Sequence, residues 1–115
     1  MVCIVGKIEG GKAVVLNLDR VDRYTVTVKT GKVDDNTITC KLCVVYDNVK
    51  IESEWKTVEI EKGVSVDEFI NSIVFHALNY IGLYSEKMIV FMDFLFDVTV
   101  ETVKRMIESR NRKGR

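Results

Sequence analysis

Three cysteines and one histidine are the residues of this sequence that could hold a transition metal. Cys40 and Cys43 have the C-x-x-C spacing of zinc and redox sites, and Cys3 with His76 would complete the four ligands of a structural zinc. However, alternating apolar residues predict a strand around Cys40 and Cys43, and side chains three positions apart on a strand point to opposite faces. We therefore interpret the cysteines as buried thiols and His76 as a residue at the edge of an apolar helix face. We expect no metal and no cofactor.

Two aspartates lie within or just after the most apolar segment, residues 88–96. Asp93 is the one charged residue inside it, so its carboxylate needs hydrogen-bond donors, a cation or solvent. If this segment is a strand parallel to the preceding one, Asp93 and Asp97 lie toward the same sheet end as the aspartates at 34–35, and together they could bind Mg²⁺ for phosphoryl chemistry. The alternative is that the strand ends near Met92 and Asp93 accepts hydrogen bonds from backbone amides of the following turn. These two aspartates are the weak catalytic candidates.

The usual signatures of an enzyme are missing. Gly6, Gly10 and Gly11 fall in an expected hairpin, so no glycine-rich phosphate loop joins a strand to a helix. With a single histidine, and no serine or cysteine at a strand-to-helix turn, the chain also lacks a nucleophile–base pair. An ordinary enzyme is disfavoured.

Charge is balanced overall but unevenly distributed. The 17 basic and 17 acidic residues give a net charge of zero, yet six basic groups gather near the C-terminus: Lys104, Arg105, Arg110, Arg112, Lys113 and Arg115. They could contact the phosphates of a nucleic acid, with stacking faces from Tyr24, Tyr46, Trp55 and Tyr84. The alternative is a solvated tail, and the acidic remainder of the chain would repel nucleic acid.

The element that organises the chain is a helix expected over residues 65–82. Its apolar side chains recur at i, i+3 and i+4: Val66, Phe69, Ile70, Ile73, Val74, Ala77, Leu78 and Ile81. Ser65 with Glu68 three residues later predicts a capping box, and Gly82 is suited to the left-handed position after the last turn. A helix this apolar must be covered by the strand-rich remainder.

Five strands are expected before this helix. Residues 2–18 predict a hairpin that turns at Gly10–Gly11, with apolar residues on both of its faces. Strands follow at about 24–29, 38–46 and 49–60. In the last of these the apolar positions change parity, which predicts a bulge or break near 53–57.

One strand and one helix are expected after it. The apolar run 88–96 is interpreted as the innermost strand, parallel to the fifth strand. Asp97 or Thr99 is expected to cap a last helix, about Val100–Arg110. Its expected inward residues are Val100, Val103, Met106 and Ile107, and Glu101 with Arg105 forms an i, i+4 pair.

The predicted fold is an α+β two-layer sandwich: a mainly antiparallel sheet of about six strands with two helices, in the order βββββαβα. Residues 1–110 form a single domain and 111–115 a basic disordered tail. The 47% apolar and 30% charged composition, without an apolar run of 18 residues, predicts a soluble chain with no membrane partner. Without a secretory signal we expect it in the cytoplasm. The absence of Gln and the many Lys and Glu residues resemble proteins of hot-growing sources.

On function, we expect a non-catalytic binding or interaction protein that works as a homo-oligomer, in the simplest case a dimer. On the helical wheel Phe75 lies opposite the apolar stripe, where Tyr84 could extend an exposed apolar patch, so these two residues are the expected interface. The first alternative is a nucleic-acid-associated protein that uses the basic C-terminal residues. The second is a Mg²⁺-dependent phosphoesterase centred on Asp93.

Overall fold

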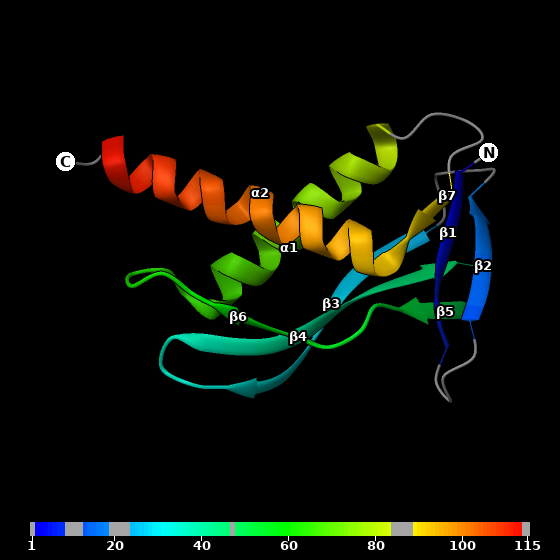
Figure 1. The fold of residues 1–115 in the computed structure, drawn as a ribbon, viewed down its shortest axis with the longest axis horizontal. Helices are drawn as coiled ribbons and strands as arrows, with labels where there is room; N and C mark the ends of the chain where they lie inside the picture. Colours follow the sequence, from blue (N-terminus) through cyan, green and yellow to red (C-terminus); the bar gives the residue numbers. More distant parts are fainter. Residues whose placement is uncertain (1, 9–12, 19–23, 47, 84–88, 114–115) are drawn as a thin grey trace.

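The computed structural model of the protein describes residues 2–8, 13–18, 24–46, 48–83 and 89–113, with side chains for 3–8, 24–46, 48–83 and 89–111 (Figure 1). The strands and helices found there are β1 (Val2–Lys7), β2 (Ala13–Leu18), β3 (Tyr24–Val33), β4 (Thr37–Tyr46), β5 (Val49–Glu52), β6 (Lys56–Glu59), α1 (Val66–Leu83), β7 (Ile89–Phe91) and α2 (Met92–Lys113). Because β5 and β6 are two halves of the single strand expected over 49–60, the α+β class and the predicted element order are confirmed.

The strands of the described residues form one mixed sheet in the order β2-β1-β5-β4-β3, with β6 paired to β4 and β7 paired to β1. All pairs are antiparallel except β1 with β7. The register of β1 against β2 confirms the first hairpin, whereas its turn at Gly10–Gly11 lies outside the described residues. β7 is parallel to β1 rather than to the fifth strand, so that expectation was wrong. Figure 1 shows β1 and β2 running across the direction of β3 and β4.

The apolar run 88–96 is mostly helix, which corrects its interpretation as the innermost strand. Only Ile89–Phe91 forms a strand, and α2 begins at the next residue. From there to Val100 the buried residues are Met92, Leu95, Phe96, Thr99 and Val100, which is helical spacing. A short apolar run does not separate a strand from a buried helix by its period, and this one contains the junction of both.

The fifth strand breaks where the change of parity predicted. Ile51 of β5 and Val58 of β6 both face the core, and the chain between them leaves the ladder at residues 53–55. Ser53 holds this break against β4, since its backbone amide donates to the Leu42 carbonyl at 2.9 Å and its hydroxyl accepts from the Leu42 amide at 2.9 Å. Trp55 is the last residue of this break, which therefore sets its position.

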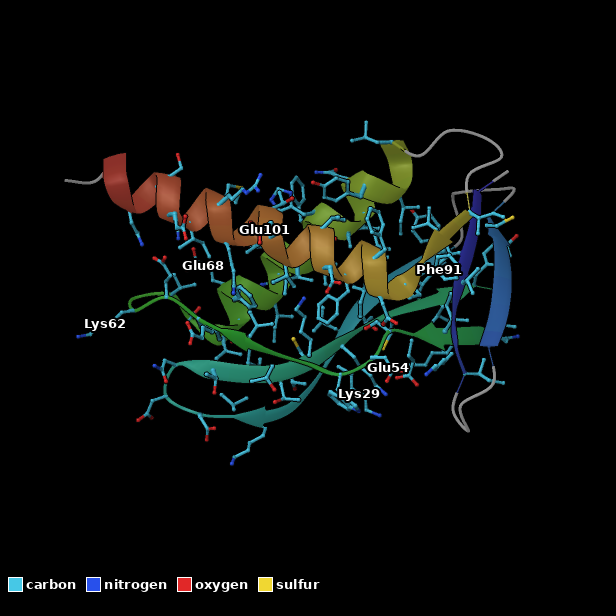
Figure 2. The ribbon with its side chains drawn as sticks, in the orientation of Figure 1. Lys29, Glu54, Lys62, Glu68, Phe91 and Glu101 are labelled. Atoms are coloured by element: carbon cyan, nitrogen blue, oxygen red, sulfur yellow. The ribbon has the colours of Figure 1, made fainter. Side chains whose placement is uncertain are left out.

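The N-terminal cap of α1 is confirmed, and its expected C-terminal cap is wrong. The Ser65 hydroxyl accepts a hydrogen bond from the Glu68 amide at 3.1 Å. The Glu68 side chain extends toward α2, where it forms an ion pair with Arg110 at 2.9 Å (Figure 2). Gly82 remains helical and α1 continues to Leu83, because a glycine can adopt the right-handed conformation as well as the left-handed one.

The buried stripe of α1 is narrower than expected. Phe69, Ile73, Ala77 and Ile81 are buried, whereas Leu78 is 39% exposed. At 100° per residue, Leu78 lies about 120° from the centre of the buried set, too far around the helix to reach the sheet. The inward position expected for Leu78 is therefore wrong.

Helix α2 extends beyond the expected bounds at both ends. Thr99 lies inside the helix, where its hydroxyl donates to the Leu95 carbonyl at 2.6 Å, so it is not a cap. Val100, Val103 and Ile107 are buried as predicted, but Met106 is 45% exposed. The pair of Arg105 with Glu101 is confirmed at 3.2 Å, and the helix runs on to Lys113.

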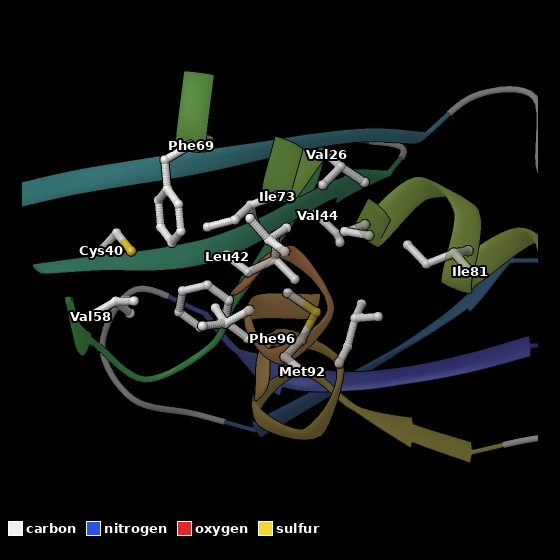
Figure 3. Packing of buried hydrophobic residues seen from close by; sticks show 14 of the residues in the cluster. Val26, Cys40, Leu42, Val44, Val58, Phe69, Ile73, Ile81, Met92 and Phe96 are labelled. Carbon is white, nitrogen blue, oxygen red and sulfur yellow. The ribbon is translucent and has the colours of Figure 1, made fainter. Parts of the chain in front are cut away.

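Both helices lie on one side of the sheet, which confirms the two-layer architecture (Figure 1). Figure 3 shows the core between the layers, where residues of β4 meet Phe69 and Ile73 of α1 and Met92 and Phe96 of α2. The β4 residues on this face are Ile38, Cys40, Leu42 and Val44, all fully buried. No helix of the described residues lies on the opposite face of the sheet.

Candidate functional site

The helix-free face of the sheet carries charged side chains from four neighbouring strands. On β4 the odd-numbered residues point to this face, among them Lys41 and Cys43. The register places Lys29 of β3 directly opposite Lys41, and Glu52 of β5 opposite Cys43. Lys7 of β1 is in turn paired with Glu52. We call this side of the sheet the open face.

A groove of about 630 Å³ lies on the open face where β5 ends and the chain crosses toward β6. Its lining residues are Lys7, Ile8, Lys29, Lys41, Asn48, Val49, Lys50, Glu52, Ser53, Glu54 and Trp55. Four lysines against two glutamates leave a formal excess of two positive charges. Its volume falls within the range of about 300–1,000 Å³ common for ligand sites. We call it the lysine groove.

Trp55 provides an aromatic surface in the lysine groove. Its side chain follows the break after β5, and the residue is 45% exposed. The indole packs on the backbone of β3 at Gly31, where a Cβ atom would come within 3.3 Å of the ring. The Lys41 ammonium lies 4.6 Å from the ring centroid, a cation–π contact. Both contacts come from the sheet, which leaves the rest of the indole open to the groove.

The floor of the groove holds a nearly buried ion pair. Lys41 Nζ lies 2.6 Å from Glu52 Oε2, and their side chains are only 14% and 11% exposed. The hydrogen bond from Lys41 lowers the pKa of Glu52 below its ordinary value, so this carboxylate is ionised at neutral pH. The Cys43 thiol donates to the same oxygen at 3.6 Å, and burial, with the negative charge of Glu52, raises the pKa of Cys43.

At the rim of the groove, one lysine forms an ion pair and two other lysines are exposed without one. Lys7 forms an ion pair with Glu54, and the hydrogen bond that Lys7 donates to the Glu54 carboxylate raises the pKa of Lys7. Lys29 and Lys50 are exposed and take part in no ion pair within the part of the chain that the structure describes. Figure 2 shows Lys62 at the left end of the molecule, away from Lys29 and Glu54, which both line the groove. Lys29 and Lys50 are therefore available to an anion.

The cysteines and the histidine lie apart from one another. Cys40 is on the core face and Cys43 on the open face, as the strand geometry predicted. Burial raises the pKa of Cys40 to about 11, which makes it an unreactive thiol at neutral pH. His76 on α1 is half-buried, with Nε2 3.2 Å from the Met106 sulfur.

The four aspartates of the Mg²⁺ hypothesis are not brought together. Asp93 lies in the first turn of α2, and its Oδ1 accepts a hydrogen bond from the Glu54 amide at 2.6 Å. Asp97 is paired with Lys56 one turn later. The aspartates at 34–35 lie in the turn between β3 and β4, and across the described ranges no three His, Cys, Asp or Glu side chains gather as metal ligands. The hydrogen bond of Asp93 is to a distant segment rather than to the following turn.

The basic C-terminal residues lie along α2, and two of them already have acidic partners. Arg105 pairs with Glu101 and Arg110 with Glu68. Lys104 is half-buried beside Ile107. The side chains of residues 112–113, and all of Arg115, lie outside the described part. Nucleic-acid binding by these residues remains a prediction.

Of the two residues expected at an oligomer interface, one lies within the described residues. Phe75 is 59% exposed on α1, opposite the buried stripe as predicted, and meets His76 edge-on at a centroid distance of 5.3 Å. It lines a shallow concavity of about 570 Å³ together with Met106. Tyr84, the other expected interface residue, lies outside the described residues.

The lysine groove was missed in the sequence, although its signals were present. Among the aromatic residues considered for stacking, Tyr24 and Tyr46 pack against the core, whereas Trp55 lies on the open face. Trp55 shares the odd-numbered positions of Val49 and Ile51, which favoured an inward side chain, so its exposed position was not predicted. Lys29 and Lys41 occupy outward positions of alternating strands. Only the pairing register brings these residues together.

Comparison with protein-family models, with curated proteins and with solved structures finds no match to this chain. In the described residues neither helix is both long and apolar enough to cross a membrane. The geometry of the lysine groove is therefore the basis for a functional proposal.

Proposed function

We propose that this protein is a non-catalytic binding protein whose lysine groove holds a phosphate-bearing anionic ligand. The observation that carries the proposal is the cluster of four lysines around a half-exposed indole in a groove of about 630 Å³. Phosphate groups are bound by ammonium groups through charge-assisted hydrogen bonds. An indole face adds affinity for a planar group attached to such a phosphate.

The arrangement of the lysines has a cost that an anion would offset. Lys29 and Lys41 face each other directly across β3 and β4, and like charges at such positions destabilise a sheet. Glu52 neutralises Lys41, but Lys29 and Lys50 form no ion pair among the described residues. A bound anion would relieve this repulsion, so the groove is better suited to a ligand than to folding alone.

The groove is suited to binding rather than to chemistry. Its two carboxylates are held by Lys41 and Lys7, and the adjacent Cys43 thiol is fully buried with a raised pKa. A nucleophile needs an accessible, activated group, and a general base needs an acceptor that is not already engaged. These side chains meet neither requirement.

The test is isothermal titration with inorganic tripolyphosphate at low ionic strength. We expect binding that weakens about tenfold or more in the double variant Lys29→Ala/Lys50→Ala, since each exposed cation near an anion contributes on the order of 1 kcal/mol. The matched control is Lys32→Ala/Lys62→Ala, which removes the same charge from exposed positions outside the groove. Equal loss in both double variants, or no heat with the wild type, would contradict the proposal.

We also propose that the protein self-associates, and a specific surface favours this. Ile89 and Phe91 of β7 and Phe94 of α2 are 66%, 60% and 57% exposed within six residues of chain. Val5 of β1 is paired with Phe91 and is half-buried on the same face. We call these four residues the β7 patch. A twofold contact would cover it with its own copy, the commonest closed assembly.

Light scattering over a hundredfold dilution tests this second proposal. We expect a concentration-dependent dimer that Phe91→Glu abolishes. The comparison variant Phe75→Glu places the same charge on the exposed side of α1, at the interface first expected from the sequence. Dissociation by Phe75→Glu alone would move the interface to the helix layer, and a monomeric wild type at every concentration would end the proposal.

A further inference from the structure

We infer that the ligand of the lysine groove is single-stranded nucleic acid, with an unpaired base stacked on Trp55 and the phosphates of its backbone on the surrounding lysines. This inference rests on the proposed anion-binding function and names the ligand class of the same site. It is carried by three features of the groove: the exposed aromatic surface, the spread of the cations and the pairing of its two carboxylates with lysines.

The exposed surface of Trp55 fits a base that has left its stack. The sheet contacts the indole through Gly31 and Lys41, while 45% of the residue remains exposed and the residue lines the groove. Stacking of a base on an aromatic side chain is largely independent of base identity, because every base has a π-face. In a duplex these faces are covered by neighbouring bases, so the contact selects unpaired nucleotides.

The lysines are spread over more of the sheet than one phosphate can contact. Lys29, Lys41, Lys50 and Lys7 belong to β3, β4, β5 and β1, which are consecutive in the sheet. Three inter-strand spacings of about 4.8 Å separate the outer two strands, a span of roughly 14 Å. Such a span matches a run of linked phosphates better than a single phosphate group.

The acidic groups of the groove do not oppose this binding strongly. Glu52 is neutralised by Lys41 at 2.6 Å, and Glu54 is paired with Lys7. The remaining positive charge comes from Lys29 and Lys50, on either side of the Lys41–Glu52 pair. Because the net charge of the whole chain is zero, attraction is local to the groove and should be sensitive to salt.

Trp55 is the single tryptophan of the chain, so its fluorescence reports on the groove directly. The experiment adds a thymidine oligonucleotide of about 12 nucleotides, within the site sizes of single-strand-binding folds. The comparison ligands are a duplex of the same length and inorganic tripolyphosphate. We expect the single strand to quench the fluorescence and to bind more tightly than the duplex. For two to four phosphate contacts, the logarithm of its affinity should fall with the logarithm of salt concentration with a slope of about −1.4 to −2.8.

Variants separate stacking from charge. Trp55→Ala should weaken single-strand binding, measured by anisotropy of a labelled oligonucleotide, by about 5- to 140-fold while leaving tripolyphosphate affinity nearly unchanged. Trp55→Phe, which keeps an aromatic ring, should restore most of the loss. Thermal melts of both variants establish that the comparison is made on folded protein.

The outcomes distinguish this inference from the proposed function. If tripolyphosphate and the single strand bind equally and Trp55→Ala changes neither affinity, the nucleic-acid inference is wrong and the anion-binding function stands. Duplex binding as tight as single-strand binding also overturns the inference. If neither tripolyphosphate nor the oligonucleotide binds, the proposed function and the inference fail together.

Discussion

The two faces of the sheet are built from alternate residues of the same strands, yet they obey different constraints. On β4, Leu42 and Cys40 face the helices and are fully buried, whereas Lys41 between them faces outward into the groove. On the helix-covered face, side-chain volume limits which residues are tolerated, since close-packed side chains leave little tolerance for a change of size. On the open face, charge limits which residues are tolerated, because the cations there need partners. This difference predicts where substitutions alter stability and where they alter binding.

The largest effect is expected on the helix-covered face. Ile73→Ala should lower the free energy of unfolding by about 2–5 kcal/mol, because Ile73 is fully buried on the side of α1 that packs in the core. Leu78→Ala, on the same helix but 39% exposed, should cost less than about 1 kcal/mol. Urea unfolding of both variants measures the contrast. Equal losses would mean that Leu78 belongs to the core after all.

The contact between β1 and the start of α2 should be nearly as sensitive to substitution. A Cβ atom at Gly6 would lie 2.6 Å from Met92 Cγ and 3.1 Å from the Glu52 carbonyl oxygen. Gly6→Ala should therefore destabilise by about 1–3 kcal/mol through overpacking. The matched control is Gly82→Ala, where a Cβ atom meets nothing within 4 Å inside α1, and a gain of about 0.5–1 kcal/mol is expected. A neutral Gly6→Ala would show that β1 and α2 can separate freely.

On the open face, stability should depend on pH through Glu52. Its pKa is lowered in the folded protein, chiefly by the hydrogen bond from Lys41. Its contribution is therefore complete above the unfolded value of 4.5 and is lost as pH falls through the folded value. Glu52→Gln should cost about 1–3 kcal/mol at pH 7, and this difference should shrink below pH 4.5.

Unfolding at pH 7 and pH 3 measures this, with Glu59→Gln as the control, an exposed carboxylate of β6 outside the groove. A difference between wild type and Glu52→Gln that is the same at both pH values would contradict the role of the ion pair.

The smallest effect is expected at the C-terminal end of α2. Removal of residues 110–115 deletes the exposed pair of Arg110 with Glu68 and the hydrogen bond from Asn111 to Glu61, so the loss of stability should stay near 1 kcal/mol. Oligonucleotide binding should also persist, since the groove is intact. Binding that disappears with this deletion would favour the C-terminal residues over the groove as the nucleic-acid site.

Periodicity in the sequence predicted the elements better than their arrangement. Local patterns in the sequence predicted three features: the cap at Ser65, the break between Ile51 and Val58, and the two-layer class. Such patterns can be recognised within single segments of the chain. The pairing of β7 with β1 does not, because it joins segments from opposite ends of the chain. The α2 boundary was misjudged because Ile89–Phe91 and the first turn of the helix form one apolar run in which Asp93 is the single charged residue.

Prediction of the candidate site from the sequence was limited in the same way. The outward position of Lys41 could be predicted from the alternation of β4, whereas the position of Trp55 could not, because its odd-numbered place matches the inward residues Val49 and Ile51. Their approach to 4.6 Å depends on the fold of the broken strand and on the absence of a side chain at Gly31. This contact cannot be predicted from sequence spacing, since these residues come from three different segments.

The parallel pairing of β1 with β7 also affects how the chain reaches its fold. β1 is joined to β5 by one register pair, Lys7 with Glu52, and to β7 by three, all with residues far along the chain. Contacts between distant segments form slowly, because a long loop must close before they stabilise anything. The unit of β3, β4, β5, β6 and α1 can assemble from nearer neighbours. During synthesis the first hairpin would therefore join the sheet only after the last third of the chain has been made. The N-terminal strands would then be among the last to take their place in the fold.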